Sequence, residues 1–181
     1  MSIQRSSILT SHRQTGVGLI EVLVALLLVA FGLLGAAGMH VRSIEYTVDT
    51  ERRQMASTVA TEMLEILRSD TVTALDAKGM PKSDLGGYGK AKGVALPSVS
   101  ASDCQPLDAT VAKRMGCWGA RAKQLIPELT DELLTSQFTV DEADGVVSVT
   151  VAWPVKKGQC LSANADKSED EFCSFRLQSR L

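Results

Sequence analysis

The chain has 181 residues, 45% of them hydrophobic and 22% charged, a length with room for one globular domain plus a small attached segment. A multidomain enzyme is therefore excluded. The 19 basic and 21 acidic side chains give a formal net charge of −2, so no strongly basic surface for nucleic acid is expected.

A hydrophobic stretch at residues 17–39 predicts a membrane-spanning helix. It contains 18 apolar residues out of 23 and a single charge, Glu21. As a helix it is about 34 Å long, close to the roughly 30 Å of a bilayer's hydrocarbon core. Residues 1–16 carry Arg5 and Arg13 and no acidic side chain, so the positive-inside rule predicts a cytoplasmic N-terminus and a periplasmic remainder.

Two simpler interpretations of this stretch remain open. A secretory signal peptide would be cleaved near Gly35, Ala36 and Ala37, but its apolar core is normally 7 to 15 residues, shorter than this one. An uncleaved signal anchor fits the length and leaves Glu21 unexplained. Because an ionisable residue within a membrane segment is costly, Glu21 is a functional candidate.

Glu21 gains a role if the chain is cut after Gly16. Val17 would then carry a free amino group, largely protonated at neutral pH, four residues before the Glu21 carboxylate. The two charges could neutralise each other within one helix or between helices staggered by about a turn.

The run from Gly16 to Glu21 and the apolar residues that follow, to about Gly38, resemble the class III signal of type IV pilins and type II secretion pseudopilins, especially the PilV group of minor pilins. The resemblance implies cleavage between Gly16 and Val17 by a prepilin peptidase and methylation of the new amine of Val17. It also implies that Glu21 registers a subunit against the N-terminus of its neighbour. The chain departs from the usual pattern, which has Phe at the position of Val17 and Thr or Ser at that of Gly18.

The apolar pattern becomes one-sided after residue 39. The spacing predicts one helix over residues 17–69, with an amphipathic half at 40–69 packed on a domain formed by residues 70–181. Its expected apolar stripe consists of Val41, Ile44, Val48, Met55, Val59, Met63 and Ile66.

The rest of the chain predicts a small α+β domain in which the long N-terminal helix packs on an antiparallel sheet, as in type IV pilins. Residues 76–103 are rich in Gly, Lys, Ser and Pro and predict a long loop. Helices are expected over 108–126, with Asp108 as N-cap, and over 128–135. Strands are expected at 137–140, 145–153, after a turn at Asp144-Gly145, and 172–178.

Four cysteines in an exported domain predict two disulfides, since no short pair suited to a metal is present. Of the three connectivities we favour Cys104–Cys117 and Cys160–Cys173, because each pair brackets one loop-containing segment. Unpaired buried thiols are the alternative. The second pair would resemble the C-terminal disulfide-bounded loop of many pilins.

The sequence offers little for catalysis, and we expect neither an enzyme nor a bound cofactor or metal. His12 lies in the leader and His40 at the membrane surface, so the outer domain has no histidine for a nucleophile or a metal centre. Acidic residues gather at Asp141, Glu142 and Asp144 and again at 169–171 without the spacing of an EF-hand, which favours solvated turns. Trp118 and Trp153 are expected in the core.

The sequence thus favours a minor pilin that primes or supports type IV pilus assembly, with twitching motility and adhesion as the associated activities. Its implied partners are the prepilin peptidase, other minor pilins, the major pilin, a tip adhesin and the inner membrane. The alternatives are a type II secretion minor pseudopilin and a membrane-tethered periplasmic enzyme or binding domain.

Overall fold

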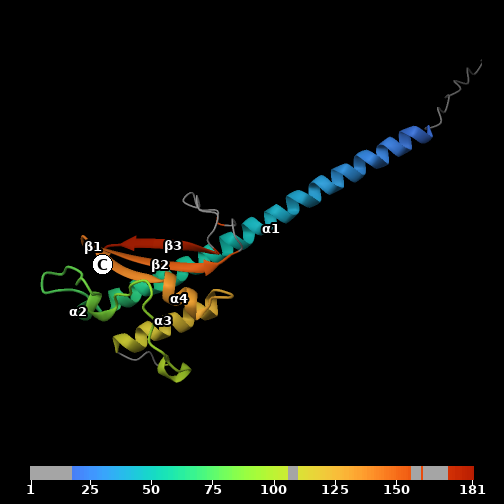
Figure 1. The fold of residues 1–181 in the computed structure, drawn as a ribbon. Helices are drawn as coiled ribbons and strands as arrows, with labels where there is room; N and C mark the ends of the chain where they lie inside the picture. The colour runs from blue at the N-terminus through green and yellow to red at the C-terminus, as the bar shows by residue number, and fades with distance from the viewer. Residues whose placement is uncertain (1–17, 106–109, 156–159, 161–170) are drawn as a thin grey trace, which may run out of the picture. The chain divides into compact units, whose positions relative to one another are not determined.

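A computed structural model describes residues 18–105, 110–155, 160 and 171–181 (Figure 1). The chain forms two compact units, Met1–Ile44 and Glu45–Leu181. Helix α1, Leu19–Ser69, contributes its first part to one unit and its second part to the other. The predicted long helix is confirmed from Leu19 onwards, and Val17 lies outside the described residues.

The second unit contains a three-stranded antiparallel sheet in the order β1-β2-β3, which confirms the predicted antiparallel sheet. Its strands are β1 (Thr139–Ala143), β2 (Val146–Pro154) and β3 (Phe172–Ser179). Asp144 and Gly145 form the turn between β1 and β2 with φ of 54° and 77°, a left-handed conformation that Asp-Gly sequences adopt in hairpins.

The core of this unit lies where α1 meets the sheet and helix α3 (Val111–Leu125). In β2, alternate residues place Val147, Val149 and Val151 in the core, as the period of two predicted. Trp118 of α3 is buried and donates its indole N–H to the carbonyl of Val59 in α1 at 2.9 Å. Trp153 is buried as well, so both tryptophans are core residues as predicted.

The long helix also makes polar contacts on both of its flanks within the second unit. Arg53 lies over the ring of Phe175 in β3 at 5.9 Å, and Arg68 donates to the hydroxyl of Ser179 at the end of that strand. On the other flank Glu62 pairs with Arg121 of α3 at 3.0 Å. The second part of α1 is thus held by the sheet and by α3 together.

The predicted helix boundaries after residue 105 are partly wrong. Helix α3 begins at Val111 with Thr110 as its N-cap, not at Asp108, which lies outside the described residues. Helix α4 covers Asp131–Gln137 rather than 128–135, because Glu128 has a φ of 63° and the Thr130 hydroxyl accepts the N–H of Leu133 to start the helix. The later end of α4 also moves the first strand from 137 to Thr139.

The predicted loop at 76–103 contains short structured pieces. Helix α2 (Thr71–Ala74) precedes it, and the 3-10 turns η1 (Leu85–Gly87) and η2 (Ala101–Asp103) lie within it. An isolated antiparallel bridge pairs Lys90 of this loop with Val140 of β1.

The predicted apolar stripe of the long helix is only partly buried. Val59 and Met63 are fully buried, and Met55 and Ile66 pack against the core. Val41, Ile44 and Val48 are exposed, so the expectation that they pack on the outer domain is wrong. The residues that complete the buried face of α1 are Ala56, Ala60, Leu64 and Leu67.

Candidate functional site

The candidate site is the first part of α1 and the residues that lead into it. Gly18 precedes the helix, and its carbonyl accepts the N–H groups of Glu21 at 2.9 Å and Val22 at 3.3 Å to close the first turn. Glu21 is exposed in this turn, where the helix macrodipole favours a carboxylate. Gly16 and Val17 lie outside the described residues, so the cleavage site stays a prediction.

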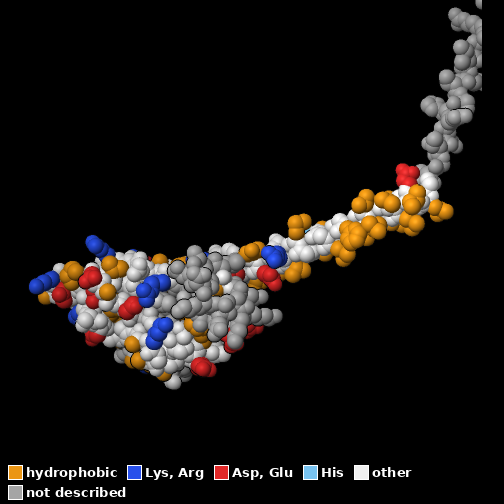
Figure 2. Space-filling model, turned by 45° about the horizontal axis from the view of Figure 1, so that its top comes forward, with side chains coloured by type: hydrophobic (Ala, Val, Ile, Leu, Met, Phe, Trp, Pro, Cys, Tyr) orange, Lys and Arg blue, Asp and Glu red, His pale blue; other side chains and the backbone are white. Residues whose placement is uncertain are grey.

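The apolar side chains before and after Glu21 are exposed around the helix. Leu19 is 86% exposed and Leu34 is 70% exposed, and Figure 2 shows hydrophobic side chains spread along the segment. A helix that is apolar on all sides is stable in a membrane or among other apolar helices. By length and composition α1 is able to cross a bilayer. The exposed set from Leu19 to Leu34 is Leu19, Ile20, Val22, Leu23, Val24, Leu26, Leu27, Leu28, Val29, Phe31, Leu33 and Leu34.

Three glycines, Gly32, Gly35 and Gly38, lie in the same segment. A Cβ atom added at any of them would meet nothing within 4 Å. No neighbour among the described residues therefore requires a glycine at these positions, and their small size leaves room for the close approach of another helix.

Residues 11–37 match the family model of the prokaryotic N-terminal methylation motif, which includes Gly16, Val17 and Glu21. The match supports a type IV pilin-like or pseudopilin-like protein. Comparison with curated proteins and with solved structures finds no match. The motif implies processing by a prepilin peptidase and pilin partners in general, and together with the apolar helix it fits a membrane-anchored pilin. Pilin-like proteins are structural rather than enzymatic.

The acidic residues of the second unit have structural partners. Glu142 accepts the N–H of Gly145 at 2.7 Å and so stabilises the β1–β2 turn, and Asp141 lies 3.8 Å from Arg176 of β3. Within the described residues no group of three or more His, Cys, Asp or Glu side chains is arranged to hold a metal ion. Glu169 and Asp170 lie outside the described residues.

Two disulfides close segments of the second unit. Cys104, directly after η2, is joined to Cys117 in the middle of α3, and Cys160 is joined to Cys173 in β3. All four cysteines of the chain are accounted for, so no thiol is available as a nucleophile.

A polar cluster at the C-terminal end of α1 had no signal in the sequence. Asp70 accepts hydrogen bonds from Thr73 at 2.7 Å and from the buried Tyr88 hydroxyl at 2.8 Å, and Arg114 of α3 lies 3.3 Å from the same carboxylate. The Thr73 hydroxyl, with smaller contributions from Tyr88 and Arg114, lowers the pKa of Asp70. Burial raises the pKa of Tyr88. The cluster ties the helix end to the loop and to α3.

Lys90 is a second feature that the sequence did not distinguish from its neighbour Lys92. Only 2% of Lys90 is exposed, and its ammonium group donates to the carbonyls of Phe138 at 2.7 Å and Thr135 at 3.1 Å. These carbonyls lie at the C-terminal end of α4, where the macrodipole favours a cation. Burial lowers the pKa of Lys90 to about 8.

Proposed function

We propose that the chain is a minor pilin of a bacterial type IV pilus, of the PilV group, and that it acts by assembly rather than by catalysis. The observation that carries the proposal is the methylation motif at residues 11–37, whose later part is the start of helix α1 with its exposed apolar side chains. The folded second unit has its own core. The apolar segment therefore takes its partners from the membrane or from other subunits.

Processing would create the group that Glu21 needs. Prepilin peptidase cleaves the peptide bond between Gly16 and Val17, and the new amine of Val17 is methylated and remains cationic. Four helical residues correspond to about 6 Å along the axis, so this amine and the Glu21 carboxylate can pair within a subunit or with a staggered neighbour.

The charge pair would fix the register of each subunit in the filament. Apolar helices gain little from the hydrophobic effect when they leave lipid for one another, because lipid tails are equally apolar. Close packing and the charge pair would thus supply the difference in free energy that favours one register over another. The subunit would begin in the inner membrane with its folded unit in the periplasm and end in the pilus, near the tip and in contact with other pilins and an adhesin.

A type II secretion minor pseudopilin is the second candidate, because it carries the same motif. The two differ in the machine that the subunit serves. Deletion of the gene followed by complementation separates them: restored twitching supports the pilus, and restored release of secreted proteins supports the secretion system.

N-terminal sequencing and intact mass of the protein purified from cells test the proposal. We expect a chain that begins at methylated Val17, and we expect Gly16→Val to accumulate as full-length precursor with its leader attached. A chain from the unaltered gene that still begins at Met1 would contradict the proposal and leave an anchored domain.

A further inference from the structure

Residues 96–104, here called the strap, lie against one face of α3. A Cβ atom added at Gly116 would lie 2.4 Å from Val99 Cγ1 and 2.6 Å from the carbonyl oxygen of Pro97. A Cβ atom added at Gly119 would lie 2.6 Å from Leu96 Cδ1. The backbone of the strap therefore approaches α3 so closely that only a glycine fits at position 116.

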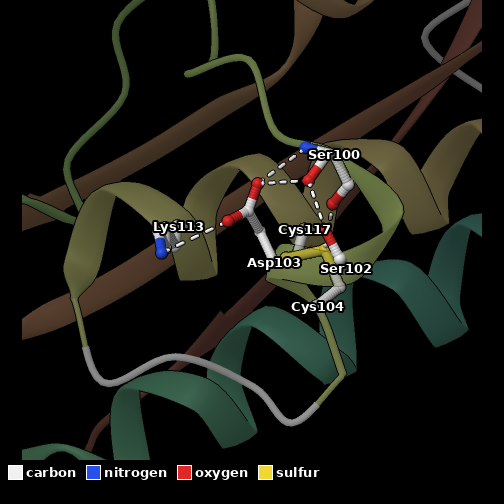
Figure 3. Close-up of polar contacts among 6 residues, drawn as sticks. All are labelled: Ser100, Ser102, Asp103, Cys104, Lys113 and Cys117. Atoms are coloured by element: carbon white, nitrogen blue, oxygen red, sulfur yellow. Dashed lines mark hydrogen bonds and ion pairs between the residues drawn. A yellow bond between two sulfur atoms is a disulfide. The ribbon is translucent and has the colours of Figure 1, made fainter.

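The last part of the strap is held by polar contacts of its own (Figure 3). Asp103 accepts the Ser100 hydroxyl at 2.6 Å and the Ser100 backbone N–H at 2.9 Å, which closes the turn η2. Its other oxygen lies 3.2 Å from the ammonium of Lys113 in the first turns of α3. The bonds from Ser100, with a smaller contribution from Lys113, lower the pKa of Asp103 to about 2, so the carboxylate is charged at every physiological pH.

Both sets of contacts converge on one disulfide. Cys104 ends the strap directly after Asp103, and Cys117 follows Gly116 in α3. Neither the glycine packing nor the Asp103–Lys113 pair involves a sulfur atom.

We propose that the strap docks on α3 before the disulfide forms, and that this docking selects Cys117 as the partner of Cys104. The alternative is selection by loop length alone. For Cys104, a partner 13 residues away is favoured over Cys160, 56 residues away, by about ninefold from chain entropy. Docking of the strap adds a further preference for Cys117 as the partner of Cys104, which loop length alone does not provide.

The effective concentration of the two thiols reports how closely the folded chain holds them, and the comparison with Gly116→Ala isolates the part that docking of the strap contributes. In a glutathione buffer the protein dithiol and one oxidised glutathione give the protein disulfide and two reduced glutathiones, so two electrons and two protons pass to glutathione. For a flexible chain the effective concentration is in the millimolar range. A docked strap holds the thiols in place, and we expect a value about 100-fold higher or more.

The experiment uses the full chain in detergent, titrated with glutathione under native conditions and again in urea, with each disulfide quantified by alkylation and mass spectrometry. The Cys160–Cys173 pair has the same separation of 13 residues and is the internal reference. We expect the Cys104–Cys117 pair to lose its excess effective concentration in urea. Equal values for this pair under the two conditions would overturn the proposal.

Gly116→Ala separates docking from the stability of the helix. Alanine is a better helix former than glycine by about 1 kcal/mol, so α3 is retained while the added methyl group displaces the strap. We expect the effective concentration of the Cys104–Cys117 pair to fall about tenfold, with no change at Cys160–Cys173. Gly38→Ala is the matched control, because its methyl group meets nothing within 4 Å. An unchanged value in Gly116→Ala would also overturn the proposal, and if that variant does not fold, the urea comparison on the unaltered chain decides.

Discussion

Removing the charge of Glu21 tests the assembly mechanism most directly. Glu21→Gln keeps the size of the side chain and its place in the first turn of α1, but in the proposed mechanism it leaves the cationic amine of processed Val17 without a partner. Breaking an ion pair in a low-dielectric environment costs about 3 to 5 kcal/mol when fully buried. In the proposed mechanism the pair would form at the start of the helix, where it can reach the membrane interface, so we expect the lower value of about 3 kcal/mol, which corresponds to an approximately hundredfold loss of incorporation.

The assay compares the variant in sheared pili with the variant in the membrane fraction, by quantitative immunoblot. Intact mass of the membrane fraction shows whether cleavage is normal, which separates a defect in assembly from a defect in processing. Glu45→Gln is the matched control, since Glu45 is exposed on the same helix beyond the apolar segment. Normal incorporation of correctly cleaved Glu21→Gln would refute the charge-pair mechanism.

Three further predictions concern the folded unit. The pKa of Lys90 is about 8 in the fold against an ordinary 10.5, so between these pH values the unfolded chain binds more protons than the folded chain. The free energy of unfolding should therefore increase as the pH rises from 8 to 10.5. Urea unfolding over this pH range checks the prediction, because Lys90→Met should lack this increase. In thermal unfolding Gly86→Ala should lower the stability of the fold by at least about 1 kcal/mol more than Gly79→Ala does. Both glycines have positive φ, but of the two only Gly86 would place its added Cβ against a backbone oxygen, that of Thr73, at 2.1 Å. Tyr88→Phe removes the buried hydroxyl that donates to the polar cluster at the end of α1, and calorimetry should show a loss of about 1 to 3 kcal/mol.

The sequence predicted the sheet well because period and turn chemistry are local signals. Alternation in β2 and the Asp144-Gly145 turn require no knowledge of the partner strand. Boundaries that depend on one capping residue were harder to predict. Thr110 precedes α3, although cap preference ranks the nearby Asp108 above it. Thr130 starts α4, and the same preference could have placed it above Glu128 and Leu129.

The polar contacts could not be predicted because they join residues far apart in the chain. Asp70 and Arg114 are 44 residues apart, and Lys90 lies 48 residues before the carbonyl that it contacts at Phe138. Lys90 is buried because its backbone pairs with Val140, whereas the nearby Lys92 is exposed. The motif at residues 11–37 needs no such pairing, since it is contiguous.

The long helix shows most clearly what periodicity can and cannot reveal. Val41, Ile44 and Val48 continue the spacing of Val59 and Met63, yet only the latter two are buried. Periodicity reports that a helix face needs an apolar partner, but not whether the partner belongs to the same chain. Within α1 the fully buried residues begin at Ala56, and only Met55 among the apolar residues before it packs against the core, so the exposed apolar side chains from Leu19 to Val48 need a partner outside the folded unit. A subunit that assembles through this helix also needs apolar surface from outside its own chain to cover these side chains.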